Sequence, residues 1–174
     1  IDPIDGTHNY MRGVPVYATL IALEVDGQLA VGAVSAPALH RRWFSWANGH
    51  AWAVDTVPGG WDRDSATPLS VSDVDRLEAA SVVYSSYPSI IESGWAPGFG
   101  QMLGRVWRDR GLGDFYGYML VAEGAAEVMV EAECPEPSQL LRTWTATDRC
   151  GNVATTTRVL TLDCSVAPCI DCEP

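Results

Sequence analysis

Two aspartates stand three residues apart in the opening stretch of the chain, IDPIDGTHNY. Pro3 disfavours helical geometry at Asp2, and Asp5-Gly6 is a turn dipeptide, so we expect a strand end that breaks into a tight turn. In such a turn the two carboxylates and the Ile4 carbonyl can converge on one point. Hard oxygen ligands of this kind suit Mg²⁺. An ordinary Asp-rich turn is the competing interpretation.

The next two residues, Gly6 and Thr7, are expected to present backbone N–H groups at the opening of a helical turn. Such a turn is a ready binding site for an anion. Carboxylates that hold a cation beside amides that hold phosphate form half of a phosphatase site. In such a site metal ions polarise phosphoryl oxygens and lower the pKa of an attacking water.

The elements that must position this motif begin with strands. Residues 18–37 hold two β-rich runs around the turn Asp26-Gly27, and residues 41–55 form a second hairpin broken at Asn48-Gly49. A loop follows at 58–68, then a short strand at 69–72, a helix after Ser72 or Asp73, and a strand near 80–85.

Further along, residues 101–109 are predicted to be helical. Asp114 is placed as the N-cap of a second helix, because apolar residues recur at helical spacing after it and Gly124 would end it. A strand is expected at 126–131. Mixed strands and helices with several hairpins indicate an α/β or α+β layered domain over residues 1–133.

Residues 134–174 differ in character from the part before them. All five cysteines lie here, and residues 1–133 have none. Residues 138–163 are rich in Thr and Val and are predicted to form two strands around a turn at Cys150-Gly151-Asn152. We therefore place a domain boundary at about residue 133, followed by a small β-rich, Cys-rich appendage.

The composition excludes several function classes. The net charge of −11 argues against a nucleic-acid partner, because phosphate backbones require clustered basic residues. All eleven basic residues are arginines, which excludes a Walker-type phosphate loop and Schiff-base chemistry. The longest apolar run, Val16–Leu23, is too short to span a bilayer. Ile1 is not a natural start, so a targeting segment is compatible with this sequence.

The string D-P-I-D-G-T-x-N-Y resembles the signature of the inositol monophosphatase family of Mg²⁺-dependent phosphatases. RGVPVYATLIALEVDGQLAVGAVSAPALHRRW and GLGDFYGYMLVAEGAAEVMVE resemble its histidinol-phosphatase branch. The resemblance covers residues 1–132. It implies a layered α+β sandwich that is truncated at its N-terminus, Mg²⁺ as cofactor, a small phosphorylated metabolite as substrate, no membrane partner and a cytoplasmic location. A homodimer is compatible with it for a full-length member.

The resemblance also implies roles for individual residues. Asp2 would bridge metal ions, and the Ile4 carbonyl and Asp5 would complete the metal contacts. Gly6 and Thr7 would hold phosphate. The Thr7 hydroxyl would orient the nucleophilic water, which makes Asp2 and Thr7 the expected catalytic residues.

Three more residues match positions near the family's substrate pocket or suit a phosphate. Asp114 and Glu131 match the pocket positions, with a helix N-cap and a strand-end surface acid as the alternatives. Arg110 suits an acidic or phosphate group, or is a solvated helix end.

Two ligands of the family pattern are not seen in this sequence. One is a glutamate that precedes the Asp-Pro-Ile-Asp motif. The other is a Trp-Asp pair, expected at about residues 137–138, where the chain has Pro137-Ser138. We therefore expect little or no phosphatase activity from the 174-residue chain itself. Inositol phosphates are the alternative substrates.

The tail from Cys134 to Leu162 resembles part of a hyalin-repeat-like extracellular module, which would suit an extracellular setting. That resemblance allows a disulfide between Cys134 and Cys150. Cys164, Cys169 and Cys172 suit disulfides, or zinc with Cys150 as fourth ligand. Two alternatives stay open: a non-catalytic phosphatase-like domain fused to a structural or adhesion module, and a junction near residue 133 that arises from gene prediction, assembly or engineering.

Overall fold

The computed structural model describes the chain except for residues 48, 58–59, 62, 133–138, 148–152 and 162–174. For residues 57, 61, 63, 139–147 and 153–161 it describes the backbone alone. The predictions for the five cysteines and for Pro137-Ser138 lie outside the described residues. The domain boundary near residue 133 also remains a prediction.

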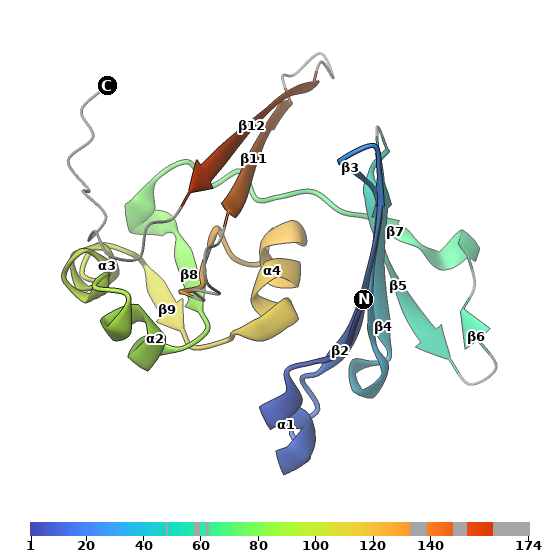
Figure 1. Cartoon of the computed structure of the whole chain (residues 1–174), viewed down its shortest axis with the longest axis horizontal. Coiled ribbons are helices and arrows are strands. Elements are labelled where there is room, and N and C mark those ends of the chain that lie inside the picture. The colour runs from blue at the N-terminus through green and yellow to red at the C-terminus, as the bar shows by residue number, and fades with distance from the viewer. Residues whose placement is uncertain (48, 58–59, 62, 133–138, 148–152, 162–174) are drawn as a thin grey trace.

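A seven-stranded antiparallel sheet forms the first layer (Figure 1), with the strand order β1-β2-β3-β4-β5-β6 and β7 paired to β5. Strands β2 and β3 pair antiparallel across Asp26-Gly27, and β4 pairs antiparallel with β5, so both predicted hairpins are confirmed. The strands are β1 (Asp2–Asp5), β2 (Ala18–Val25), β3 (Gln28–Ala36), β4 (Arg41–Trp46), β5 (Ala51–Val57), β6 (Gly60–Trp61) and β7 (Thr67–Pro68).

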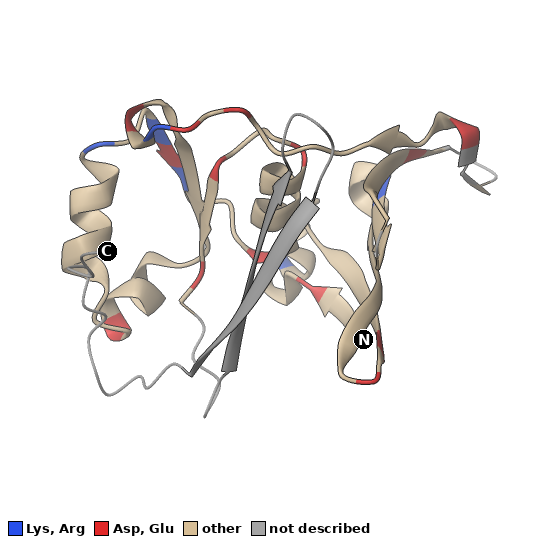
Figure 2. Ribbon diagram, turned by 90° about the horizontal axis from the view of Figure 1, so that it is seen from above, with Lys and Arg blue, Asp and Glu red and all other residues tan. Residues whose placement is uncertain are grey.

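A three-stranded parallel sheet with the order β10-β8-β9 forms the second layer. Its strands are β8 (Ser81–Tyr84), β9 (Arg108–Arg110) and β10 (Val128–Val130). The helices are α1 (Thr7–Arg12), α2 (Tyr87–Glu92), α3 (Ala96–Leu103) and α4 (Asp114–Ala122), with 3-10 turns at Pro37–Leu39, Arg63–Ser65 and Leu77–Ala79. Acidic positions occur in both layers (Figure 2).

Helix α4 lies between the two layers (Figure 1) and packs against both. Its Phe115 is 3% exposed and belongs to one core cluster with Ala18, Trp43 and Ala53 of the large sheet. A second cluster is centred on Val82 and joins the small sheet to α2 and α3. The predicted helix beginning at Asp114 and the strand after it are confirmed. The layered α/β class is confirmed as well.

Three local predictions were wrong in whole or in part. Residues 101–109 do not form one helix: α3 ends at Leu103, and Arg108–Arg110 is an edge strand that pairs in parallel with β8. The polar sequence Arg-Asp-Arg shows no apolar alternation, so only the pairing with β8 makes it a strand. The predicted strand at 69–72 is replaced by β7, and the helix expected after Ser72 or Asp73 is only the 3-10 turn Leu77–Ala79.

The predicted strands of the tail are present as β11 (Gln139–Thr147) and β12 (Val153–Thr161), which pair antiparallel. Their pairing supports the β-rich character of this part, but nothing supports the resemblance to a hyalin-repeat-like module. No helix in the described part of the chain is long and apolar enough to cross a membrane.

Candidate active site

The opening motif contains an irregularity that turns both aspartates to the same side. In the antiparallel pair of β1 and β2, Asp2 lies opposite Leu20 and Asp5 lies opposite Ala18, so the spacing is three residues on β1 but two on β2. A regular strand would place Asp2 and Asp5 on opposite faces, because side chains alternate. Directly opposed residues on two strands share a face, and Leu20 and Ala18, two residues apart on β2, also share a face. The bulge in β1 therefore places Asp2 and Asp5 on that same face. The two carboxylates therefore lie on one face of the sheet.

That face is the one covered by α4. Ala18, opposite Asp5, is 1% exposed and packs in the cluster that contains Phe115. Asp5 Oδ2 accepts a hydrogen bond from the Phe115 backbone N–H at 2.7 Å. Gly113, the residue at the α4 N-cap, has no side chain for this task, so Asp5 caps the helix from 110 residues away in sequence. The helix dipole also favours a negative charge at this end.

Gly6 and Thr7 form the turn between β1 and α1. Gly6 has φ +73°, and a Cβ there would lie 2.9 Å from the Val16 carbonyl oxygen, so only glycine fits. Thr7 Oγ1 donates to the Ile4 carbonyl at 2.8 Å. Asp2 Oδ1 accepts from the Ile4 N–H at 3.1 Å. The predicted sequence of strand end, tight turn and helical turn is confirmed.

The sequence reasoning missed Asn9, which connects the motif to α4. Its Nδ2 donates to Asp114 Oδ2 at 3.1 Å. Asp114 is the first residue of α4 and has φ +55°, so its predicted N-cap role is wrong: the cap position is Gly113, and Asp5 supplies the capping oxygen. The Asn in D-G-T-x-N-Y was the available signal, but its partner lies 105 residues away.

The other pocket candidates have partners elsewhere. Glu131 Oε2 accepts a hydrogen bond from the Tyr118 hydroxyl of α4 at 2.6 Å. Arg110 is exposed at the end of β9, and its guanidinium donates to the Asp109 carbonyl at 2.6 Å. Roles of Arg110, Asp114 and Glu131 in a substrate pocket remain predictions.

The donor set at the motif suits a Mg²⁺ ion that keeps most of its water. No group of three or more His, Cys, Asp or Glu side chains capable of holding a metal occurs among the described residues. Asp2, Asp5 and the Ile4 carbonyl remain, and Mg²⁺ commonly binds through one or two carboxylates together with water and substrate phosphate. The carbonyl oxygen has a second lone pair beyond the one used by Thr7. These residues therefore fit such an ion.

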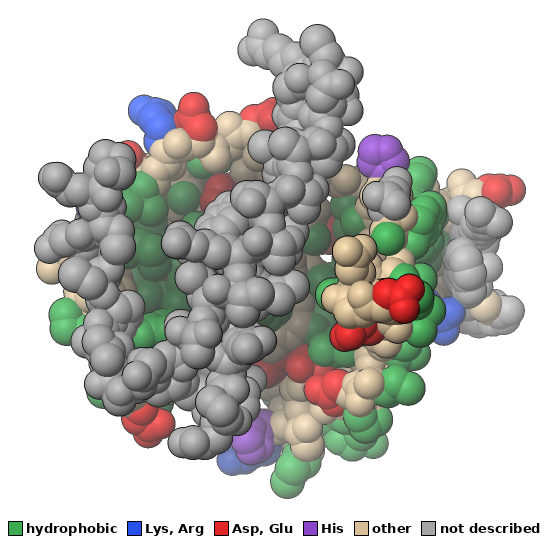
Figure 3. Space-filling model, turned by 45° about the horizontal axis from the view of Figure 1, so that its top comes forward, with side chains coloured by type: hydrophobic (Ala, Val, Ile, Leu, Met, Phe, Trp, Pro, Cys, Tyr) green, Lys and Arg blue, Asp and Glu red, His purple; other side chains and the backbone are tan. Residues whose placement is uncertain are grey.

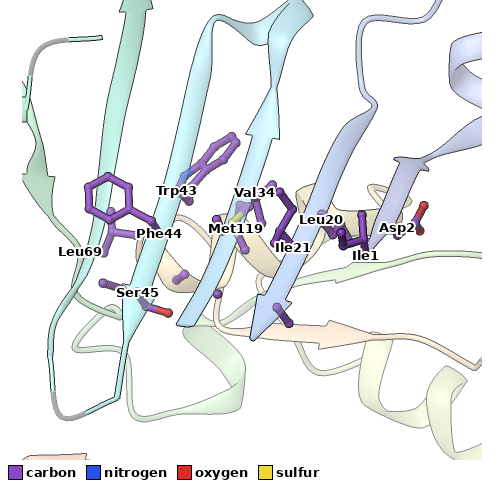
Figure 4. Close-up of a pocket in the computed structure, with 15 residues that line it drawn as sticks. Ile1, Asp2, Leu20, Ile21, Val34, Trp43, Phe44, Ser45, Leu69 and Met119 are labelled. Atoms are coloured by element: carbon purple, nitrogen blue, oxygen red, sulfur yellow. The ribbon is translucent and has the colours of Figure 1, made fainter. Parts of the chain in front are cut away.

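A hollow of about 380 Å³ lies beside the motif, between the large sheet and α4. Figure 4 shows it extending from Leu69 and Trp43 at one end to Ile1 and Asp2 at the other, with Met119 between them. Its lining is largely apolar. A phosphate group would lose its hydration there without replacement, so the anion is expected at Gly6-Thr7 rather than in the hollow.

The C-terminal end of α4 is tied to the sheet by Glu123. Its Oε1 accepts from the Trp43 indole N–H at 2.7 Å and from Arg41 Nε at 2.9 Å. Arg41 also pairs with Asp55 at 2.6 Å. Partial burial alone would lower the pKa of Arg41, but the hydrogen bonds to Glu123 and Asp55 outweigh it, so the pKa is raised. Both ends of α4 are therefore fixed to the sheet that carries the motif.

The layered fold and the Asp-x-x-Asp-Gly-Thr turn held against the N-terminus of α4 agree with the family that the sequence resembles. The model of the inositol monophosphatase family matches residues 1–144, and the chain belongs to this family. The match extends past residue 133, into β11.

Two relatives are similar over most of the chain. They are the histidinol-phosphatases of Streptomyces coelicolor, 49% identical over 139 residues, and of Mycobacterium tuberculosis, 49% identical over 140 residues. Each match covers 76% of this chain and 49% of the relative, so the chain spans about half the length of these relatives. Among solved structures, Mycobacterium tuberculosis SuhB shares the fold with a TM-score of 0.62 and 23% identity, over 88% of this chain and 63% of SuhB.

Proposed function

We propose that this chain carries the Mg²⁺- and phosphate-binding motif of a phosphomonoesterase that acts on histidinol phosphate. The bulge in β1 is the observation that supports the chemistry most directly, because it turns Asp2 and Asp5 to one face beside the start of α4. The similarity to two histidinol-phosphatases over three quarters of the chain supports this substrate over inositol phosphates.

Asp2, Asp5 and the Ile4 carbonyl would hold the cation. When bound, Mg²⁺ would polarise the phosphoryl oxygens and lower the pKa of a water molecule. The chain has a net charge of −11 and no lysine, so a bound divalent cation also offsets the repulsion of an anionic substrate.

The protein's own groups would position the water and the phosphate. Thr7 donates its proton to the Ile4 carbonyl, which leaves the Thr7 oxygen to accept a hydrogen bond from the attacking water. The first hydrogen bond of α1 runs from the Tyr10 N–H to the Gly6 carbonyl. The N–H groups that precede it have no partner within the helix, and we assign those of Gly6 and Thr7 to a phosphate oxygen.

Phosphate release by two proteins tests this proposal. One is the 174-residue chain, and the other is the Streptomyces coelicolor relative with its matched region replaced by that of this chain. We expect little or no turnover by the first, because two carboxylates alone hold Mg²⁺ weakly. The hybrid should hydrolyse histidinol phosphate at least about tenfold faster than myo-inositol 1-phosphate, and only with Mg²⁺.

Variants of the hybrid identify the residues responsible. Asp2→Asn and Asp5→Asn should each reduce kcat by about 10² or more. Glu78→Gln removes an exposed acid that is paired with Arg105 and should leave kcat unchanged. A folded hybrid without Mg²⁺-dependent activity would refute the proposed function, and a preference for inositol phosphate would refute the proposed substrate.

A further inference from the structure

Helix α1 begins at the turn Gly6-Thr7, which we call the phosphate turn, but little holds this helix in place. It has six residues, none of them is buried, and it projects beyond the two layers (Figure 1). A helix of this length is not stable by itself, because helix formation is cooperative and begins with a costly nucleus. The Thr7 hydroxyl bonds the Ile4 carbonyl, within the same turn. The position of α1 must therefore depend on contacts with other elements.

Asn9 supplies such a contact. Its Nδ2 donates to Asp114 Oδ2 at 3.1 Å, and both residues are half-buried. Asp114 is the first residue of α4, and it precedes Phe115, whose N–H donates to Asp5. The same end of α4 therefore holds both halves of the motif. It holds the candidate metal ligands through Asp5 and the phosphate turn through Asn9.

The backbone of Asp114 indicates that the surrounding structure determines its place. Its φ of +55° lies in the left-handed region, which is costly for most residues other than glycine. Residues strained in this way persist only where their surroundings fix them, and they cluster at functional sites. The carboxylate of Asp114 also lies against the phosphate turn, because a Cβ on Gly6 would be 3.3 Å from Asp114 Oδ2. The strained conformation thus accompanies a contact between α4 and the turn.

The negative charge of Asp114 requires a partner at this position. The chain has a net charge of −11, and acidic side chains are more prominent than basic ones on the face shown in Figure 3. A carboxylate without a partner beside Gly6 would repel a phosphate bound at the turn. The Asn9 amide donates a hydrogen bond without adding a charge. It holds Oδ2, the same oxygen that lies against Gly6.

We propose that Asn9 and Asp114 are positioning residues that join α1 to the start of α4 and so fix the phosphate turn relative to the metal ligands. Neither residue touches the substrate in this role. The inference rests on the proposed function, because it concerns how the same site is assembled. Changes at this pair should weaken phosphate binding and turnover but leave Mg²⁺ binding intact, because Asp5 keeps its own hydrogen bond to α4.

Variants of the hybrid enzyme test the pair. Asn9→Ala removes the donor, and Asn9→Asp also places a second carboxylate against Asp114. An exchange variant combines Asn9→Asp with Asp114→Asn. It restores a hydrogen bond in the opposite direction, and asparagine tolerates the left-handed backbone at position 114. Met11→Ala is the matched control, because Met11 is 75% exposed on the same helix.

We expect kcat/KM for histidinol phosphate to fall at least about tenfold in Asn9→Ala, as for the loss of a hydrogen bond to a charged group. The inhibition constant of inorganic phosphate should rise by a similar factor, and both effects should be larger in Asn9→Asp. The exchange variant should recover most of the loss, and Met11→Ala should match the unchanged hybrid. The Mg²⁺ dissociation constant, measured by calorimetry, should be the same in all of them, which a general loss of packing would not allow.

A second measurement needs no activity and uses the 174-residue chain. The Tyr10 N–H donates to the Gly6 carbonyl at 3.0 Å, so its hydrogen exchange reports whether α1 is formed. This exchange, followed by NMR, should become at least about tenfold faster in Asn9→Ala, although alanine favours a helix more than asparagine does. Exchange should be unchanged in Met11→Ala, and exchange of the Phe115 N–H should be unchanged in both variants.

Three results would overturn the proposal. The first is a folded Asn9→Ala variant with unchanged kcat/KM or unchanged Tyr10 exchange. The second is a parallel loss of Mg²⁺ and phosphate binding in Asn9→Ala, because the pair would then support the fold in general. The third is an exchange variant no better than Asn9→Asp, because the Asp114 carboxylate itself would then be required.

Failure of the proposed function gives a different result. An unchanged hybrid that folds but has no Mg²⁺-dependent activity would refute the proposed function. The exchange rate of the Tyr10 N–H in the 174-residue chain would still decide whether Asn9 positions α1.

Discussion

Substitutions at Asp5 separate its structural role from its proposed role as a metal ligand. Asp5 is half-buried, and its Oδ2 accepts the Phe115 N–H at 2.7 Å. Asp5→Ala removes this acceptor and leaves a helix N–H without a partner, a loss of about 2 kcal/mol in the free energy of unfolding. Asp5→Asn keeps an acceptor oxygen and loses only the charge that favours the helix N-terminus, about 0.5 kcal/mol.

Thermal unfolding followed by circular dichroism checks the difference. At about 3 °C per kcal/mol for a chain of this size, Tm should fall by about 6 °C for Asp5→Ala and by about 2 °C for Asp5→Asn. Mg²⁺ binding, measured by calorimetry on the hybrid enzyme, should be lost in both variants. Asp2→Asn is the control: Asp2 is exposed and accepts a local N–H from Ile4, so the Tm of this variant should barely change while Mg²⁺ binding is lost.

Two outcomes would contradict this reasoning. An equal loss of Tm for Asp5→Ala and Asp5→Asn would show that the hydrogen bond to Phe115 does not account for the stability. Full Mg²⁺ binding by Asp5→Asn would remove Asp5 from the ligand set while leaving its capping role intact.

Three further predictions concern packing and charge. Gly117→Ala should lower the free energy of unfolding by about 2 kcal/mol, because the added Cβ would lie 2.6 Å from the Leu112 carbonyl oxygen. Gly100→Ala should raise it by about 0.5–1 kcal/mol, because the added Cβ would meet open space on α3. Urea unfolding measures both changes. Glu123→Gln removes the charge that pairs with Arg41 and should lower the free energy of unfolding by about 1 kcal/mol in the same assay. The loss is modest because the pair is partly exposed to solvent. The pKa of Arg41 is raised in the folded state, so the stability that its charge contributes is complete below its ordinary pKa and is lost only as the pH rises through the raised pKa. The Tm measured from about pH 6 to about pH 9 should therefore show no step caused by Arg41.

Local signals in the sequence predicted much of the fold. The hairpin of β2 and β3 depends on Asp26-Gly27, where two adjacent residues determine the turn. The helix at Asp114 and the strand at Val128–Val130 follow from spacing that a short window contains. The missed helix α2 also had a local signal, because Ser86 caps it and Pro88 stands in its first turn.

The wrong predictions share one cause: each of these features depends on a partner that is distant in the sequence. Arg108–Arg110 is a strand because it pairs with β8, more than 20 residues earlier in the chain. The bulge in β1 exists only in relation to β2, so the sequence of the motif alone does not reveal that Asp2 and Asp5 share a face. Asp114 is displaced from the predicted cap position because a carboxylate from the other end of the domain performs that task.

The site is therefore a property of the tertiary structure rather than of the motif. A peptide with the sequence IDPIDGTHNY contains every motif residue, but neither the β2 partner that aligns Asp2 with Asp5 nor the Phe115 N–H that fixes Asp5. Helix α4 is in turn held by Glu123 on Trp43 and Arg41 of the same sheet. Any change that shifts α4 against the sheet must move the Phe115 N–H relative to Asp5. The geometry of the candidate metal site thus depends on packing along the whole length of α4.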